Sequence, residues 1–238
     1  SVVEDTIVLP LNNEQALREA LQEHGEDVAC VIIEPIPANN GLLIQHASFL
    51  KLLRKLTEDH GILLFFDEVI SGFRVGFTGA AGHFDIQPDI VSYGKIIGGG
   101  LPVGAYGGKK EIMDHVAPVG DVYQAGTLSG NPVAMSAGIA QIKETLRPGF
   151  YEDLEKRTND FVNTIMDHVK AKDYDFYMYS IGSIFWFSFG SSDVVRNADD
   201  ISQDGVKRFT AFFHSLLASG IYIGPSGYEV GFISHAHK

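Results

Sequence analysis

Residues 62–68 have the sequence Ile-Leu-Leu-Phe-Phe-Asp-Glu, an apolar run that passes directly into two acids. A strand that is apolar on both faces is typical of a sheet covered by helices on both sides. Segments with the apolar spacing of helices flank this run, and further short apolar runs repeat the alternation. This order predicts an α/β fold with a mainly parallel sheet and helices on both faces.

The rest of the chain continues this alternation and then changes character. Helices are expected between Asn13 and Gly25, at 49–60, from about 131, at 150–172 and at 203–219. Strands are expected at 28–33, 62–66, 89–93, 103–107, 174–180 and 183–189, and near residues 221 and 231. We expect a domain boundary after residue 147, with residues 1–147 in a large α/β domain and residues 148–238 in a smaller α+β domain.

The chain has 238 residues, a net charge of -12 and a single cysteine, Cys30. This acidity argues against a nucleic-acid partner, which would need a basic face. Cys30 can form neither an intrachain disulfide nor a thiolate metal cluster, and we expect it to be a small buried residue of its strand. No apolar stretch is long enough to cross a bilayer, so we expect a cytoplasmic protein with no membrane partner.

Residues 92–102 have the sequence Ser-Tyr-Gly-Lys-Ile-Ile-Gly-Gly-Gly-Leu-Pro. This is not a phosphate-binding P-loop, because Gly94-Lys95 is followed by isoleucine, and it contains no dinucleotide-binding pattern. Lys95 follows a strand and has apolar neighbours, so desolvation would favour its neutral amine, which is the nucleophile that forms an imine. The alternative is an exposed lysine in a flexible turn.

Asp67 ends the apolar strand and is either a structural cap or a functional group. Because Asp67 and Lys95 both follow strand ends, we expect them to share one site at the carboxyl edge of the sheet. A fixed carboxylate can keep a pyridine nitrogen protonated. Val69 would point to the same side as Asp67 and could pack on such a ring. Glu68 would point away, and we expect it to form a salt bridge with Arg74.

Residues 126–132, Gly-Thr-Leu-Ser-Gly-Asn-Pro, precede a predicted helix start. Hydroxyl and N–H groups at such a place suit a phosphate, and they also suit a helix cap. We assign Thr127 to the phosphate, and Ser129 or Asn131 to the cap. No metal site is predicted, because His235 and His237 form a close pair without a third ligand nearby.

Three stretches together resemble the class III, fold-type I, pyridoxal-phosphate-dependent aminotransferases: residues 67–74, Gly94-Lys95 with its glycine run, and residues 126–132. Within that family, residues 98–138 and 225–229 are most similar to the glutamate-1-semialdehyde 2,1-aminomutases. The resemblance covers essentially the whole chain. It implies pyridoxal 5'-phosphate as cofactor, with a pyridoxamine 5'-phosphate form in the cycle. It also implies an amino-aldehyde or amino-acid substrate and a homodimer with shared active sites.

The resemblance also implies roles for individual residues. Lys95 would form the Schiff base with the cofactor and move protons between carbon centres, while Asp67 would pair with the ring nitrogen. Val69 would pack on the ring, and Asn39 would reach the phenolic oxygen of the cofactor. Thr127 would bind the phosphate of the neighbouring subunit's cofactor.

Glu229 matches a position near the substrate entrance. Two stretches depart from the aminomutase pattern: residues 38–41 are Ala-Asn-Asn-Gly where Gly-Asn-Met-Gly is usual, and Ile70-Ser71 replaces the more common Met-Thr. The N-terminal part of the family's pattern and its last helix lie outside the chain. We therefore expect residues 1–147 to be the C-terminal portion of the large cofactor-binding domain and residues 148–238 to be an incomplete small domain.

The function favoured by this resemblance is intramolecular amino transfer, which converts glutamate-1-semialdehyde to 5-aminolevulinate in tetrapyrrole (porphyrin) biosynthesis. An alternative is a class III transaminase that acts between an amine donor, such as an ω- or β-amino acid, and a keto acid. A second alternative is a cofactor-free binding or assembly remnant, although the presence of Lys95, Asp67 and Thr127 together argues against it.

Overall fold

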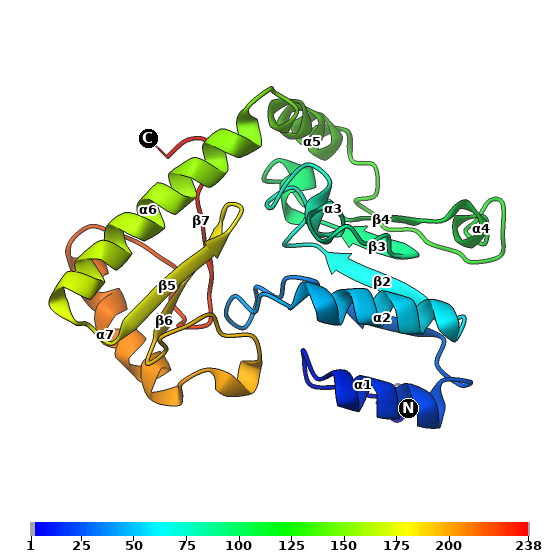
Figure 1. The fold of residues 1–238 in the computed structure, drawn as a ribbon. Coiled ribbons are helices and arrows are strands. Elements are labelled where there is room, and N and C mark those ends of the chain that lie inside the picture. The colour runs from blue at the N-terminus through cyan, green and yellow to red at the C-terminus, as the bar shows by residue number, and fades with distance from the viewer. Residues whose placement is uncertain (1–2, 238) are drawn as a thin grey trace.

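The structure, a computed structural model, describes residues 3–237, in which two sheets are flanked by helices (Figure 1). Within these residues, the first sheet has the order β1-β2-β3-β4, with β1 (Cys30–Ile33), β2 (Leu63–Glu68), β3 (Ile90–Tyr93) and β4 (Ala105–Gly108). β1, β2 and β3 are parallel, and β4 is antiparallel to β3. The α/β fold with a mainly parallel sheet is therefore confirmed.

Two helices pack against the first sheet, α2 (Ala47–Asp59) and α3 (Gly79–Phe84), and α1 (Glu14–His24) packs on α2 (Figure 1). The side chain of Asn13 caps α1 by accepting the Ala16 N–H at 2.9 Å, as predicted. Because side chains alternate along a strand, Leu64 and Phe66 of β2 are buried under these helices, while the intervening side chains are only half-buried.

The expectation that Cys30 is buried is wrong. The strand register pairs Cys30 with Leu63 and Ile32 with Phe65, so all four side chains lie on the face of the sheet opposite to α1 and α2. On that face Cys30 is exposed, and Ile32 is 60% exposed. An apolar run alone does not tell which face of an outer strand is covered, and this is why the sequence was misleading here.

Within the first sheet, η1 (Lys95–Gly98) connects β3 to β4, and the chain then leaves the sheet through α4 (Lys110–Met113) and α5 (Pro132–Thr145). The second layer contains an antiparallel sheet with the order β5-β6-β7, with β5 (Phe176–Ile181), β6 (Ile184–Phe189) and β7 (Gly231–Phe232). It is packed against α6 (Phe150–Lys172) and α7 (Gln203–Ala218), and the short η2 (Ala198–Asp200) precedes α7.

The strand expected near residue 221 is absent from the part of the chain that the structure describes. The Ile221 N–H donates to the Leu216 carbonyl at 2.9 Å, so this segment turns back on the end of α7 instead of pairing with a strand. The strand predicted near residue 231 is present as β7.

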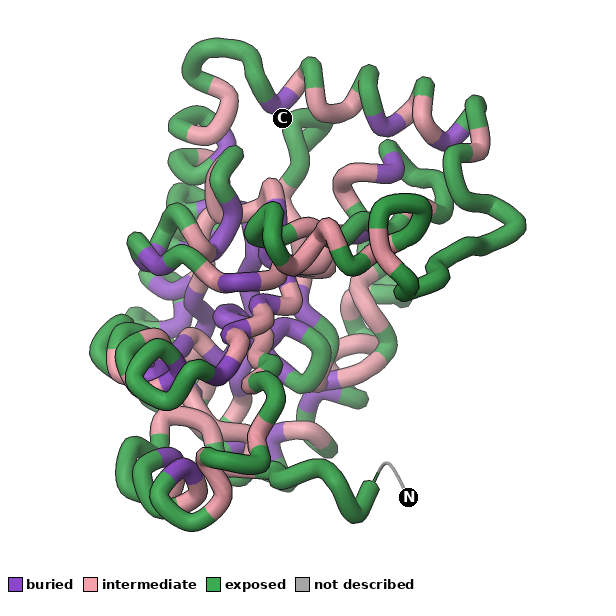
Figure 2. Tube along the Cα trace, turned by 90° about the vertical axis from the view of Figure 1, so that its right-hand side faces the viewer, coloured by how far each residue is buried: buried purple, intermediate pink, exposed green. Residues whose placement is uncertain are grey.

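The two layers share a hydrophobic core. Trp186 and Ile184 of β6 and Tyr179 of β5 pack in one cluster with Leu64 and Phe66 of β2. Figure 2 shows that the buried positions gather in the middle of the molecule, with exposed positions along the outer helices and loops. We retain the boundary at residues 147/148 as a proposal, because it separates α5, which packs on η1, from α6, which packs on β5.

Among residues 3–237, no helical segment combines the length and the apolar character that a membrane crossing requires.

Candidate active site

Asp67 and Lys95 lie at the same edge of the first sheet. Asp67 is the next-to-last residue of β2 and pairs in register with Ser92 of β3, and Lys95 begins η1 two residues after β3 ends. β2 and β3 are parallel, so both residues occupy the carboxyl edge, where ligands bind in open α/β sheets. We predicted from the strand ends that Asp67 and Lys95 lie at one edge of the sheet, and this geometry agrees with that prediction.

The carboxylate of Asp67 is fixed through one of its two oxygens. Oδ1 accepts the Val69 N–H at 3.0 Å and the Ser92 hydroxyl at 3.1 Å. Within residues 3–237, Oδ2 has no hydrogen-bond partner. The carboxylate is therefore oriented but has a second oxygen available to a ligand. The role of Ser92 was missed, although its place three residues before Lys95 on the strand beside Asp67 was a usable signal.

Lys95 has an unusual backbone conformation and an exposed side chain. Its φ of 49° lies in the left-handed region, which is rare for residues other than glycine and is concentrated at functional sites. We expected apolar neighbours to desolvate Lys95, but Lys95 is exposed and lines an open cavity of about 500 Å³. A cavity of this volume can hold a small organic ligand.

Val69 packs directly against the backbone that leads into Lys95. A Cβ atom added at Gly94 would lie 3.1 Å from Cγ1 of Val69, so Gly94 permits this close approach. Val69 also donates its N–H to Asp67. Val69 thus contacts both Asp67 and the residue that precedes Lys95.

Glu34 is a further acid near this edge that the sequence reasoning did not assign to the site. It follows β1, and since Ile33 pairs with Phe66, Glu34 comes next to Asp67. Burial, and then the negative charge of Asp67, raise the pKa of the Glu34 carboxyl, against the Ala38 N–H and the positive charge of Lys95. Its position just after a strand end, like that of Asp67, was the available signal.

Asn39 and Glu229 lie on two loops that contact each other. The Gly41 N–H donates to the Tyr228 carbonyl at 2.7 Å, which joins the loop of Asn39 to the loop of Glu229. Gly41 has a φ of 88°, and a Cβ there would lie 2.9 Å from the ring of Trp186, so this close contact requires glycine. Asn39 and Glu229 are both exposed.

Thr127 lies in an exposed loop before α5, and no hydrogen bond joins it to Lys95 or Asp67 within residues 3–237. Asn131 caps α5 by accepting the Val133 and Ala134 N–H groups at 3.1 and 3.2 Å, as predicted. The structure gives the cap to Asn131 and not to Ser129.

The salt bridge expected between Glu68 and Arg74 is absent, and that prediction is wrong. Glu68 is fully buried and accepts the Ala80 N–H at 2.6 Å, the Ala81 N–H at 2.9 Å and the Ser71 hydroxyl at 3.1 Å. The free N–H groups at the start of α3 satisfy this carboxylate in place of a cation. Burial raises the pKa of Glu68 despite these three hydrogen bonds.

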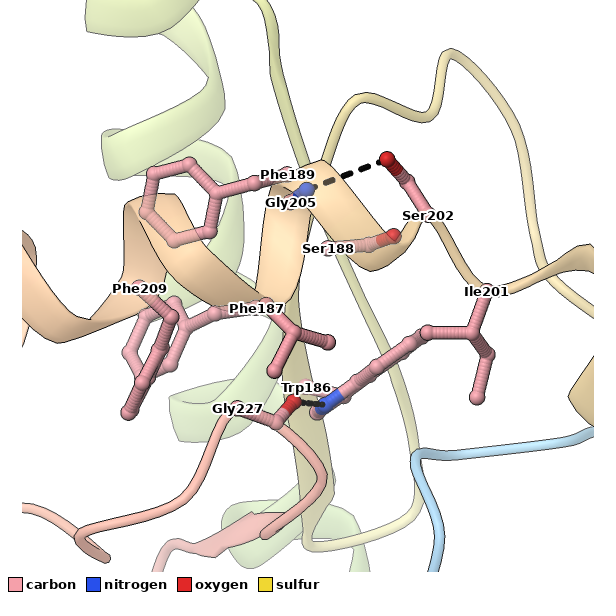
Figure 3. A pocket seen from close by; sticks show the side chains of 10 residues that line it. Trp186, Phe187, Ser188, Phe189, Ile201, Ser202, Gly205, Phe209 and Gly227 are labelled. Carbon is pink, nitrogen blue, oxygen red and sulfur yellow. Dashed lines mark hydrogen bonds between the residues drawn. The ribbon is translucent and has the colours of Figure 1, made fainter.

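A second cavity lies between α7 and β6 (Figure 3). It has a volume of about 10 Å³, which is enough for one water molecule at most. The Trp186 indole N–H donates to the Gly227 carbonyl beside it at 2.9 Å (Figure 3). This space is a packing defect of the core and too small for a substrate. No group of three or more potential metal ligands occurs within residues 3–237.

The structure thus has a mainly parallel sheet with an oriented aspartate and an exposed lysine at its carboxyl edge. The model of the family "Aminotransferase class-III" matches residues 3–235, and the chain belongs to this family.

The curated relatives include aminomutases. The chain is 49% identical over 237 residues to the glutamate-1-semialdehyde 2,1-aminomutase of Leptospira biflexa, covering 99% of this chain and 56% of that protein. It is 46% identical over 237 residues to the enzyme of the same name from Legionella pneumophila (strain Paris), covering 100% of this chain and 55% of that protein. The chain therefore spans about half the length of the curated relatives that it matches.

A solved structure with a closely similar fold is an omega-transaminase from Sphaerobacter thermophilus, with a TM-score of 0.90 and 30% sequence identity. The match covers 98% of this chain and 53% of that protein. The fold is thus shared by aminomutases and transaminases of the family, and it does not separate their activities.

Proposed function

We propose that this chain carries the Schiff-base lysine of a pyridoxal-phosphate-dependent aminomutase. The whole protein would convert glutamate-1-semialdehyde to 5-aminolevulinate, a step of tetrapyrrole biosynthesis. The observation that carries this proposal is the common position of Asp67 and Lys95 at one sheet edge. The 49% identity to a relative named as this aminomutase supports the choice of substrate.

The residues at this edge fit pyridoxal 5'-phosphate. The ring nitrogen requires a fixed carboxylate with an available oxygen, and Oδ2 of Asp67 meets that requirement. The ring requires a flat apolar contact, which Val69 can supply beside Gly94. The aldehyde requires an accessible amine, and the side chain of Lys95 is exposed.

When bound, pyridoxal phosphate supplies an electron sink that stabilises negative charge on a substrate carbon. Lys95 would hold the cofactor through its Nζ, and the same atom would accept and return protons of the substrate carbons. Asp67 keeps the ring nitrogen protonated, because a neighbouring negative charge raises the pKa of a cationic acid. Asn39 would hold the phenolic oxygen, and Glu229 would act at the substrate entrance.

The whole protein is proposed to be a cytoplasmic homodimer in which Thr127 binds the phosphate in the neighbouring subunit's site. The exposure of Thr127, and the absence of a hydrogen bond from it to Lys95 or Asp67 within residues 3–237, support this arrangement.

Borohydride reduction of the full-length protein tests the assignment of the lysine. Cofactor should be fixed covalently to Lys95, and Lys95→Ala should abolish both the label and turnover. A cofactor label on another lysine would refute the assignment.

A class III transaminase is the second candidate, supported by the similarity to the Sphaerobacter thermophilus fold. Assay with glutamate-1-semialdehyde alone separates the two activities. An aminomutase forms 5-aminolevulinate without a second keto acid, whereas a transaminase requires one.

A further inference from the structure

Glu34 is a half-buried acid at the carboxyl edge of the first sheet, and it has no part in the steps assigned to Lys95 and Asp67. It directly follows β1, whose last residue Ile33 pairs with Phe66, so Glu34 lies next to Asp67. Side chains alternate along both strands, and the carboxyls of Glu34 and Asp67 therefore lie on the same face of the sheet. Two carboxylates at neighbouring positions of adjacent strands repel each other. The second negative charge at this edge is thus costly unless a cation joins the pair.

The two carboxyls differ in how well their charged forms are stabilised. Asp67 accepts the Val69 N–H at 3.0 Å and the Ser92 hydroxyl at 3.1 Å. Within residues 3–237 the Glu34 carboxyl receives one hydrogen bond, from the Ala38 N–H. Hydrogen bonds to the ionised form favour it, so Asp67 holds its charge more readily than Glu34 does. A proton bound by this pair therefore resides on Glu34.

The charged groups that act on the Glu34 carboxyl within residues 3–237 are Asp67 of β2 and Lys95 of η1. Burial, and then the charge of Asp67, raise the pKa of Glu34, while the Ala38 N–H and the charge of Lys95 oppose them. A cation that pairs with Asp67 cancels its repulsion and lowers the pKa of Glu34. Glu34 then loses its proton more easily.

We propose that Glu34 is a positioning residue that acts through Asp67: it holds a proton while Asp67 is unpaired and releases it to solvent when the cationic cofactor ring pairs with Asp67. Only the O–H bond of the Glu34 carboxyl breaks, and water takes the proton. This inference deepens the proposed function, because it takes Asp67 as the partner of the ring nitrogen. The ionised Glu34 adds a second negative charge behind Asp67, which favours the cationic form of the ring.

Calorimetry with pyridoxamine 5'-phosphate measures this linkage in the full-length, cofactor-free protein. The probe has the ring of the cofactor but no aldehyde, so it does not react with the Lys95 amine. The Kd of wild type should fall relative to that of Glu34→Gln as the pH rises through the Glu34 pKa, by about tenfold if that pKa shifts by about one unit. Titrations in buffers of different ionisation enthalpy count the protons. Close to the Glu34 pKa, wild type should release up to about one proton more than Glu34→Gln.

Matched variants make the test specific to this acid and to its path of action. Glu34→Asp retains an acid and should retain the pH-dependent step, whereas Glu155→Gln, at an exposed acid of α6, should match wild type. In an Asp67→Asn background, Glu34→Gln should change neither the Kd nor its pH dependence, because the ring then lacks the charged partner through which Glu34 acts. A ratio of the wild-type and Glu34→Gln Kd values that is constant across pH overturns the proposal. An effect of Glu34 that persists in Asp67→Asn also overturns it.

Thermal unfolding of the cofactor-free protein separates this role from a structural one. The pKa of Glu34 is raised in the folded state, so its ionisation lowers stability as the pH rises from 4.5 through the folded-state pKa. Glu34→Gln should therefore melt at or above the wild-type temperature when the pH exceeds the folded-state pKa, relative to their difference below pH 4.5. If Glu34 instead forms a stabilising ion pair with Lys95, the variant will melt below wild type at high pH, and the proposal fails.

Borohydride labelling keeps this inference distinct from the proposed function. If wild type neither binds pyridoxamine 5'-phosphate nor carries cofactor on Lys95, the proposed function and this inference fail together. If wild type carries cofactor on Lys95, but Glu34→Gln shows the wild-type pH dependence of Kd and the wild-type proton release, the inference about Glu34 is overturned alone.

Discussion

At the scale of single residues, Asp67 combines a rigid position with an available oxygen. The two hydrogen bonds to Oδ1 come from Val69 and Ser92, which belong to the same sheet edge as the acid itself. A carboxylate held in this way loses little conformational entropy when a ligand binds to its other oxygen. The charge of Asp67 is therefore separable from its position, and an isosteric substitution can test it.

Asp67→Asn should retain cofactor on Lys95 but reduce turnover by at least about a hundredfold. Asparagine can still accept both hydrogen bonds through Oδ1, but it removes the charge that raises the pKa of the ring nitrogen. A shift of two pKa units corresponds to about 2.7 kcal/mol. Borohydride labelling and steady-state turnover of the full-length protein measure the two effects. Asp85→Asn, at an exposed αL position, is the matched control, and near-normal turnover in Asp67→Asn would contradict the role.

At the scale of elements, Asp89 connects strands β2, β3 and β4 of the first sheet with helix α2. It precedes β3 and accepts the Leu64 N–H of β2 at 2.7 Å. It also pairs with Arg54 of α2 at 2.8 Å and with Lys109, just after β4, at 2.6 Å. Burial alone would raise the pKa of Asp89, but these three partners hold it below 3.8.

Asp89→Asn should destabilise the full-length protein by about 3 kcal/mol, because it removes the buried carboxylate that pairs with Arg54 and Lys109 and leaves Arg54 only its ion pair with the exposed Glu58. The pKa of this acid is lower in the folded state, so its stabilising effect is present above pH 3.8 and is lost as the pH falls through the folded-state pKa. Urea unfolding at several pH values measures both effects. The variant should lose less stability than wild type below pH 3.8, and parallel curves would contradict the assignment.

The cap of α5 supports the element that packs on η1. Asn131→Ala removes the acceptor for two N–H groups and should cost about 1 kcal/mol. Asn131→Asp keeps an acceptor and should restore most of that loss. Denaturant unfolding of the two variants provides the comparison, and equal stability of Ala and Asp variants would show that the cap is unimportant.

Local sequence signals predicted helices, strands and helix caps better than they predicted which side chains are buried and what those side chains bind. Asn13 and Asn131 were recognisable as caps because capping depends on residues three positions apart at most. Cys30 was misjudged because the covering of each sheet face depends on distant helices. The partner of Glu68 was also misjudged, since α3 supplies its N–H groups from twelve residues away. The left-handed backbone of Lys95 cannot be read from local composition.

At the scale of the whole molecule, we propose that the site is divided between two chains. Asp67, Val69, Lys95 and Asn39 would belong to one chain, while Thr127, which is exposed, would serve the neighbouring site. A homodimer with two shared sites would then be the smallest active unit.

Co-expression of Lys95→Ala with Thr127→Ala in the full-length protein tests this division. In a heterodimer, one site carries both lesions and the other carries neither, so turnover should exceed that of either variant alone. Tagged subunits allow heterodimers to be isolated and counted, and single-variant homodimers are the controls. If purified heterodimers show no gain while Thr127→Ala alone clearly weakens phosphate binding, the shared site is excluded.

The hydrogen bond between Gly41 and Tyr228 has a consequence for biosynthesis. The ribosome synthesises Gly41, in the loop of Asn39, nearly two hundred residues before Tyr228, whose carbonyl accepts the Gly41 N–H. Trp186, which fills the space beside Gly41, also emerges late. A nascent chain can therefore form the sheet that carries Asp67 and Lys95 while the loop of Asn39 remains unsupported. Cofactor binding should therefore follow synthesis of the whole chain. Ribosome-bound chains stalled before residue 228 should bind the cofactor weakly.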